Sequence, residues 1–142
     1  MSTRCQIVVE GSNVVIYRHG DGYPEGKNGV VAALKKIVPQ FVAARGFDEV
    51  YMPAHIVSSM IVDHHKTFGA DSPYHFLGFG IEGYENPNSG FALHGDIEFL
   101  YVVKKNGTIE VRSCFNDPNG PDNIGNTKVI KTVKYKLPKV AV

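Results

Sequence analysis

The stretch TRCQIVVEGSNVVIYR, residues 3–18, decides the fold of this chain. It holds two runs rich in β-branched residues, 3–10 and 14–18, and such runs favour extended strands. The turn residues Glu10-Gly11-Ser12-Asn13 stand between them. Gly11 suits the first central position of a type II′ turn, which takes glycine there. The stretch therefore predicts a β-hairpin at the start of the chain.

The register of this hairpin makes a prediction about Arg4. With a two-residue turn, Ile7 lies opposite Ile16 and Arg4 lies opposite His19. A slip of one or two residues moves Arg4 opposite a later residue of the segment 19–21. In every register, the Arg4 guanidinium is expected to lie near this segment.

Two helices are predicted after the hairpin. Apolar residues recur at helical spacing over residues 30–42, and Gly46 suits the C-cap. Pro39 lacks a backbone N–H and is expected to kink this helix. The second helix is predicted to start near Pro53, a favoured first-turn residue, and to end by Gly69.

The second half of the chain is predicted to form strands. They are expected over Tyr74–Glu85, Asp96–Lys104, Thr108–Phe115 and Thr127–Leu137, with a loop over 116–126. Asn106-Gly107 is a strong signal for a tight hairpin turn. The side chains expected to face the helices are Ile97, Phe99, Tyr101 and Val103. The order ββ-αα-ββββ predicts an α+β fold with a mainly antiparallel sheet and two helices packed on one face.

Length and composition indicate one domain over residues 1–142. Hydrophobic residues make up 43% and charged residues 20%, which is typical of a globular rather than a disordered chain. No apolar run approaches the ~20 residues of a membrane-spanning helix, and no secretory core follows Met1. Cys5 and Cys114 fit no metal spacing and suggest a reducing cytoplasm, with a disulfide between them as the alternative. We expect neither a metal nor a cofactor.

The predicted C-terminal strand is rich in lysine. The net charge of +1 argues against bulk nucleic-acid binding. From residue 128 onward there is no acidic residue, and the lysines are Lys128, Lys131, Lys134, Lys136 and Lys139. By strand alternation Lys131 lies on one face and Lys128, Lys134 and Lys136 lie on the other. Such a strand is typical of a sheet edge that lysines protect from aggregation; contact with phosphates or with a second copy of the chain is the alternative.

The segment YRHGDGYPEG, residues 17–26, concentrates the recognition chemistry. Arginines hold phosphate or carboxylate by paired hydrogen bonds, and a His–Asp pair serves acid–base chemistry. Tyrosines stack on planar bases, and glycines let backbone N–H groups approach an anion. The alternative is an ordinary turn in which Asp21 caps its own backbone and pairs with Arg4. The candidate ligand-binding residues here are Arg4, Tyr17, Arg18, His19, Asp21, Gly22, Tyr23 and Glu25.

The tripeptide His-Gly-Asp occurs again at residues 94–96. Strand alternation places His94, Asp96 and Glu98 on one face, so they join the candidate ligand-binding residues. A plain solvated sheet face is the alternative. Each copy of the tripeptide joins a turn to a strand, and we therefore expect the two copies to line one pocket, with Tyr23 as its aromatic wall.

The opening Met1-Ser2-Thr3-Arg4 and the segment 17–26 resemble a family of small uncharacterised proteins, many of them encoded by bacteriophages and prophages. Its recurring pattern is Met-x-Thr-Arg followed by His-x-Asp-Gly-Tyr-Pro, and similar members continue with a segment like residues 94–101. The resemblance covers residues 1–115, so residues 116–142, a loop and the Lys-rich strand, look like an addition. It implies no assigned reaction or cofactor.

Three functions follow as expectations. The first is a non-catalytic binding protein that sequesters a phosphate-bearing nucleotide signal, such as a cyclic nucleotide or an ADP-ribose derivative, to counter host defence. The second is a phosphodiesterase or related hydrolase in which His19 and His94 act as acid and base. Two-histidine phosphoesterases carry a hydroxyl residue where Asp stands in both copies here, which counts against this function. The third is an inhibitor that occludes a host protein.

Overall fold

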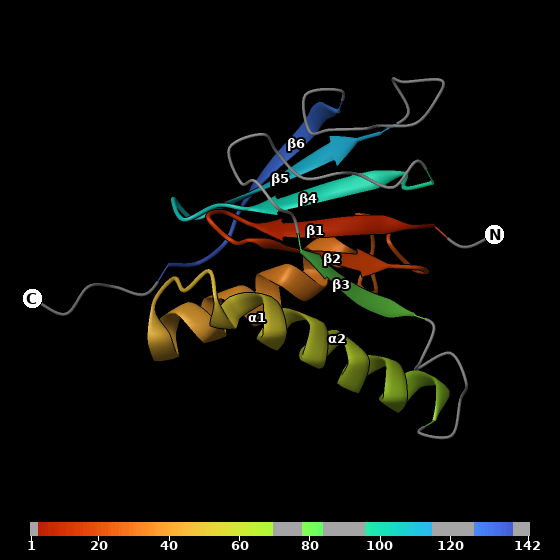
Figure 1. Cartoon of the computed structure of the whole chain (residues 1–142), viewed down its shortest axis with the longest axis horizontal. Coiled ribbons are helices and arrows are strands. Elements are labelled where there is room, and N and C mark those ends of the chain that lie inside the picture. The colour runs from red at the N-terminus through yellow and green to blue at the C-terminus, as the bar shows by residue number, and fades with distance from the viewer. Residues whose placement is uncertain (1–2, 70–77, 84–95, 115–126, 138–142) are drawn as a thin grey trace, which may run out of the picture.

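The computed structural model describes residues 3–69, 78–83, 96–114 and 127–137, and shows a six-stranded sheet with two helices on one face (Figure 1). In chain order the elements are β1 (Cys5–Val9), β2 (Val14–Arg18), α1 (Val30–Arg45), α2 (Tyr51–Phe68), β3 (Phe79–Gly83), β4 (Phe99–Val103), β5 (Thr108–Ser113) and β6 (Lys128–Lys134). The predicted α+β class and the order ββ-αα-ββββ are confirmed. The predicted loop over 116–126 lies outside the described residues, as do both ends of the strand predicted over Tyr74–Glu85.

The strands lie in the order β3-β2-β1-β4-β5-β6. Four of the five neighbouring pairs are antiparallel, so the prediction of a mainly antiparallel sheet is confirmed. The exception is the central pair, in which β1 and β4 run parallel from Cys5 beside Phe99 to Val9 beside Val103. Every residue of β1 is buried. This pair joins the two halves of the chain.

The first hairpin has the predicted register, with Ile7 opposite Ile16. Its turn differs from the prediction. The N–H of Ser12 donates to the carbonyl of Val9 at 2.9 Å, and Gly11 has a φ of 84°. Gly11 therefore occupies the second central position of a turn that begins at Val9, and not the first position that a type II′ turn requires.

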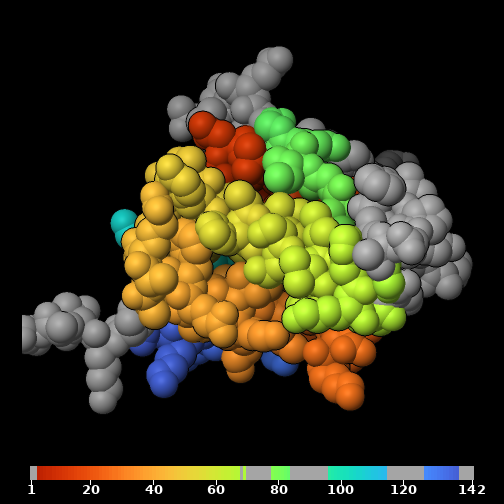
Figure 2. Space-filling model, turned by 90° about the horizontal axis from the view of Figure 1, so that it is seen from below, coloured from red at the N-terminus to blue at the C-terminus, as the bar shows by residue number. Residues whose placement is uncertain are grey.

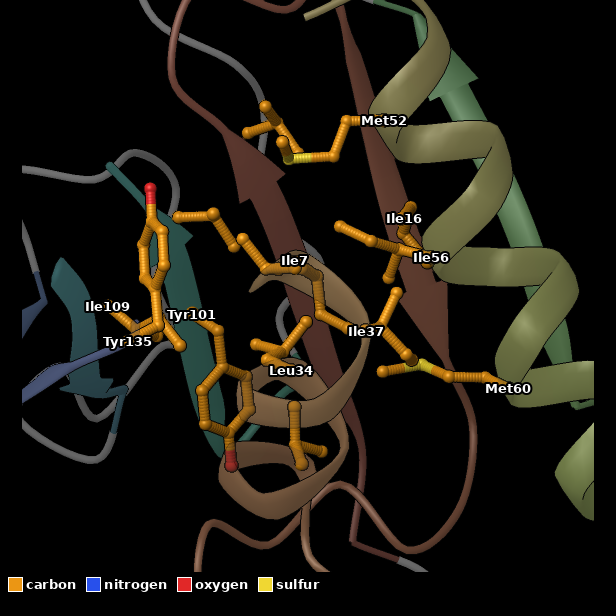
Figure 3. Close-up of a cluster of buried hydrophobic side chains, with 14 of the residues drawn as sticks. Ile7, Ile16, Leu34, Ile37, Met52, Ile56, Met60, Tyr101, Ile109 and Tyr135 are labelled. Atoms are coloured by element: carbon orange, nitrogen blue, oxygen red, sulfur yellow. The ribbon is translucent and has the colours of Figure 1, made fainter. Parts of the chain in front are cut away.

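The helices form the main core with one face of the sheet. In Figure 3, Ile7 and Tyr101 of the sheet meet Leu34 of α1, and Ile56 and Met60 of α2 point toward the same core. Figure 2 shows α1 and α2 covering most of this face. The first helix contains Pro39 and ends at Gly46, whose φ is 83°. Neither helix is both long and apolar enough to cross a membrane, as far as the chain is described.

A second, smaller cluster lies on the opposite face of the sheet. It contains Val8, Val15, Ile97, Leu100, Val102 and Cys114. Tyr101 and Val103 belong to the helix-side core and Phe99 packs against it, as predicted. The prediction for Ile97 was wrong, because residues 96–98 form a turn and a bend before β4 begins and so break the alternation.

The predicted tight turn at Asn106-Gly107 is confirmed. The N–H of Lys104 donates to the carbonyl of Thr108 at 2.8 Å, and Gly107 has a φ of 93°. The Oδ1 of Asn106 accepts the backbone N–H of Thr108 at 3.2 Å. A left-handed glycine at the last loop position is typical of three-residue hairpin loops.

The Lys-rich strand β6 is at the edge of the sheet, as predicted, and pairs with β5. Its register shifts between Val111, which pairs with Lys131, and Arg112, which pairs with Val129. The intervening residue of β6 forms a β-bulge, which breaks the alternation of faces. Lys128 therefore shares the helix side with Lys131, whereas alternation had predicted opposite faces.

Candidate functional site

Three strand ends meet at one end of the sheet. Because β1 is antiparallel to β2 and parallel to β4, the start of β1 lies beside the end of β2 and the start of β4. The backbone N–H of Glu98 donates to the carbonyl of Arg4 at 2.9 Å, which extends the pairing of β1 with β4. Residues just before β1, just after β2 and just before β4 are thereby brought together, although they are far apart in the sequence.

Four polar side chains form a hydrogen-bonded cluster at this place: Arg4, Tyr17, His19 and Asp96, here called the Arg4 cluster. The Nε of Arg4 donates to Nδ1 of His19 at 3.3 Å. The same Nε lies 3.5 Å from Oδ2 of Asp96, and the Tyr17 hydroxyl donates to this oxygen at 3.1 Å. The prediction that Arg4 lies near the segment 19–21 is confirmed. Arg4 therefore links Asp96 of the second His-Gly-Asp copy to His19 of the first.

The Arg4 cluster lies on the sheet face away from the helices. Cys5 faces the helix-side core, so its neighbour Arg4 projects to the opposite side. Tyr17 packs against the smaller apolar cluster on that side. The side chains of Arg4 and Asp96 are 37% and 45% exposed, so a dissolved molecule can reach both charges.

The hydrogen bonds indicate which atoms of His19 and Tyr17 act as donors and which as acceptors. Because Nδ1 of His19 accepts the bond from Arg4, the neutral ring carries its proton on Nε2. Burial raises the pKa of the Tyr17 hydroxyl, and the hydrogen bond to Asp96 and the charge of this carboxylate raise it further. Tyr17 therefore stays protonated at neutral pH and donates to Asp96.

Several polar atoms of the cluster have no partner among the residues that the structure describes. The terminal Nη1 and Nη2 groups of Arg4 bond to no residue that the structure describes, and the same holds for Nε2 of His19 and Oδ1 of Asp96. The cluster thus presents the donors of a guanidinium and an imidazole beside one carboxylate acceptor. Such a set can bind an anionic group that carries a neighbouring hydroxyl.

Gly22 anchors the segment that follows β2. Its backbone N–H was a candidate donor to an anionic ligand, but it bonds within the protein. This N–H donates to the carbonyl of Thr3 at 2.9 Å, and the hydroxyl of the buried Tyr101 donates to the Gly22 carbonyl at 2.6 Å. A Cβ atom at this position would lie 2.8 Å from the Thr3 carbonyl oxygen and 2.9 Å from Cβ of Cys5. Only glycine fits here without displacing its neighbours. Sequence reasoning missed Thr3 and Tyr101 as its partners.

Arg18 does not join Arg4 in one anion site. It pairs with Cys5 in the sheet and so lies on the helix side. Its Nε donates to the carbonyl of Gly20 at 2.8 Å, and its guanidinium lies 5.3 Å from the centre of the Phe79 ring. These contacts stabilise the start of the segment after β2.

The remaining candidates have no described bond to the Arg4 cluster. Asp21 is exposed, with a φ of 55°, and Glu25 is exposed as well. Tyr23 is half-buried, and its carbonyl accepts the N–H of Val30 at the start of α1, at 2.9 Å. Glu98 contributes its backbone to the pairing of β4. His94 lies outside the described residues, so only Asp96 of the second His-Gly-Asp copy is seen near His19, and the shared pocket stays a prediction.

The described residues hold no group of three or more His, Cys, Asp or Glu side chains that could bind a metal ion. A groove of about 440 Å³ between α1 and α2, with Phe41, Arg45 and His55 in its lining, lies on the other side of the sheet from the Arg4 cluster.

Comparisons with protein-family models, with curated proteins and with solved structures found no match.

Proposed function

We propose that the protein binds a small phosphate-bearing ligand at the Arg4 cluster and holds it without chemical change. The observation that carries this proposal is the divided role of the Arg4 guanidinium. Its Nε bonds to His19 and lies beside Asp96, while its two terminal NH2 groups bond to no described residue and belong to a side chain that is 37% exposed. An arginine held at one nitrogen is oriented in advance, and its terminal pair matches two phosphate oxygens.

The neighbouring groups favour a nucleotide over other phosphate compounds. Nε2–H of His19 is a second donor for phosphate, and Oδ1 of Asp96 is an acceptor for a ribose hydroxyl. We take Tyr23, half-buried in the segment after β2, as the candidate aromatic ring for a base. We therefore take the ligand to be a nucleotide signal, such as a cyclic nucleotide or an ADP-ribose derivative.

The protonation of His19 favours binding over hydrolysis. A general base needs an unprotonated ring nitrogen directed at the substrate. Nδ1 of His19 is occupied by Arg4, and Nε2 carries the proton, so the neutral ring offers a donor. The hydrolase in which His19 and His94 act together is therefore the second choice. The occlusion of a host protein is the third.

The resemblance to phage-encoded proteins supplies a biological setting for such binding. A phage protein that captures a nucleotide second messenger would block the defence that depends on it, in the cytoplasm of the infected cell. Capture needs a preformed site and a tight complex but no nucleophile.

The test is incubation of the protein with a panel of nucleotide signals, followed by analysis of the free ligand before and after heat denaturation. Depletion with intact release after heating supports the proposal, an altered product supports the hydrolase, and no depletion contradicts both. Arg4→Gln is expected to weaken binding about 10- to 100-fold, because a charge-assisted hydrogen bond contributes about 1.5–3 kcal/mol. The matched control is Arg45→Gln, an exposed arginine of α1 paired with Asp48 at 3.3 Å, which should leave binding unchanged.

A further inference from the structure

We infer that Asp96 shifts the selectivity of the Arg4 cluster toward monoanionic phosphodiesters and away from dianionic phosphomonoesters. The inference rests on the proposed function, since it concerns the ligand of the same site. It favours as the ligand a compound whose phosphate is esterified twice.

The position of Asp96 carries the first step. Its Oδ2 lies 3.5 Å from the Nε of Arg4, so its negative charge stands beside the guanidinium whose far side would receive the phosphate. The two anions would then lie on opposite sides of one guanidinium group. At low ionic strength, where the Debye length is about 30 Å at 0.01 M, salt would screen their repulsion only in part.

The second step is that Asp96 is held in this position. The hydroxyl of Tyr17 donates to the same Oδ2 at 3.1 Å, and the ring of Tyr17 packs against the apolar cluster on this face of the sheet. A carboxylate fixed by a neighbouring hydroxyl cannot turn away from an incoming anion without breaking that bond. The repulsion is therefore a lasting property of the site.

The third step is the charge of the ligand. A phosphomonoester carries close to two negative charges above its second pKa of about 6, whereas a diester carries one. The additional charge is repelled by Asp96 across a partly solvated surface, where the interaction of two unit charges changes affinity about three- to tenfold. Arg4 attracts the dianion more strongly than the monoanion, and Asp96 offsets part of this attraction.

The experiment compares adenosine 5′-monophosphate with its methyl ester by titration calorimetry at pH 8 and low salt. The two probes share base, ribose and hydroxyl groups and differ by one methyl group and one negative charge. Asp96→Asn keeps the shape of the side chain and is expected to tighten binding of the monophosphate more than that of the methyl ester. The ratio of the two affinities is therefore expected to shift about three- to tenfold toward the monophosphate, relative to the wild-type protein.

The control is Glu110→Gln. Glu110 pairs with Val102 and so lies on the same sheet face, where its carboxylate contacts Arg112 at 3.2 Å. Its replacement should leave the ratio unchanged, because it is not part of the Arg4 cluster. A ratio that Asp96→Asn does not change would overturn the inference while the proposed function stands. If the protein binds neither probe nor any nucleotide of the panel, both are wrong.

Discussion

Replacement of Gly22 by alanine is expected to destabilise the protein although it adds one methyl group. Gly22 is buried, and its added Cβ would lie 2.8 Å from the carbonyl oxygen of Thr3 and 2.9 Å from Cβ of Cys5. Both neighbours are part of the backbone or attached directly to it, so they cannot turn away. Relief of this contact requires the Gly22 N–H to leave the Thr3 carbonyl, to which it donates at 2.9 Å.

The magnitude follows from these two terms. Overpacking in a tight site costs about 1–3 kcal/mol, and loss of a hydrogen bond costs about 0.5–1.5 kcal/mol. We therefore expect Gly22→Ala to lower the free energy of unfolding by about 2–4 kcal/mol, a large share of the roughly 5–15 kcal/mol that stabilises a typical domain. Urea unfolding followed by circular dichroism measures this difference directly.

Two other glycines serve as controls for Gly22→Ala. A Cβ at Gly80 in β3 would meet no atom within 4 Å, so Gly80→Ala should be neutral or stabilise by up to about 1 kcal/mol. Gly26 also has open space but a φ of 82°, so Gly26→Ala should cost only the backbone strain of about 1–2 kcal/mol. If Gly22→Ala proves as stable as Gly80→Ala, the crowding at Thr3 and Cys5 has no energetic consequence and the anchoring role is wrong.

Two further predictions concern the thiols and the start of α2. Burial raises the pKa of the Cys5 thiol to about 12 and that of the Cys114 thiol to about 11, so neither should react with a disulfide reagent at pH 8 until the protein unfolds. The unfolded thiols ionise near their usual pKa of 9.0, while the folded thiols stay protonated. The free energy of unfolding should therefore fall as the pH rises from 9.0 to about 12. Rapid labelling of the folded protein at pH 8 would contradict the protection of the thiols. Oδ1 of Asp48 accepts the N–H groups of Val50 at 2.9 Å and Tyr51 at 3.0 Å, and these bonds lower the pKa of the carboxyl. Asp48→Ala should melt at a lower temperature than Asp48→Asn, because asparagine can still cap the helix. The stabilisation by the Asp48 carboxylate should be lost as the pH falls below 3.8, the usual pKa of this carboxyl. Equal melting temperatures for the two variants would contradict the capping role.

Local patterns in the sequence predicted most of the elements. The hairpin register, both helix ends and the turn at Asn106-Gly107 depend on residues that lie close together in the chain, and the structure agrees with all of them. The predictions failed where an irregularity interrupts the alternation of side chains along a strand. The turn and bend over residues 96–98 place Ile97 on the face opposite to the predicted one, and the β-bulge in β6 does the same for Lys128. Alternation alone does not reveal either irregularity.

The candidate site could be predicted in part. The hairpin register brought Arg4 to His19, and the repeated tripeptide pointed to Asp96. The bond from Tyr17 to Asp96 and the anchoring of Gly22 by Tyr101 could not be foreseen. Both depend on the parallel pairing of β1 with β4, which joins distant parts of the chain and leaves no signal in local periodicity.

The parallel pairing of β1 with β4 also sets the order in which the protein can fold. Cys5 pairs with Phe99, so about ninety residues must be organised before this contact closes, and the entropy of closing long loops makes such contacts form late. The first hairpin and both helices depend on local contacts and can form earlier. Arg4 is synthesised before Asp96, and it acquires this partner only when β4 has been made and docked. A nascent or truncated chain that ends before β4 therefore lacks the complete Arg4 cluster.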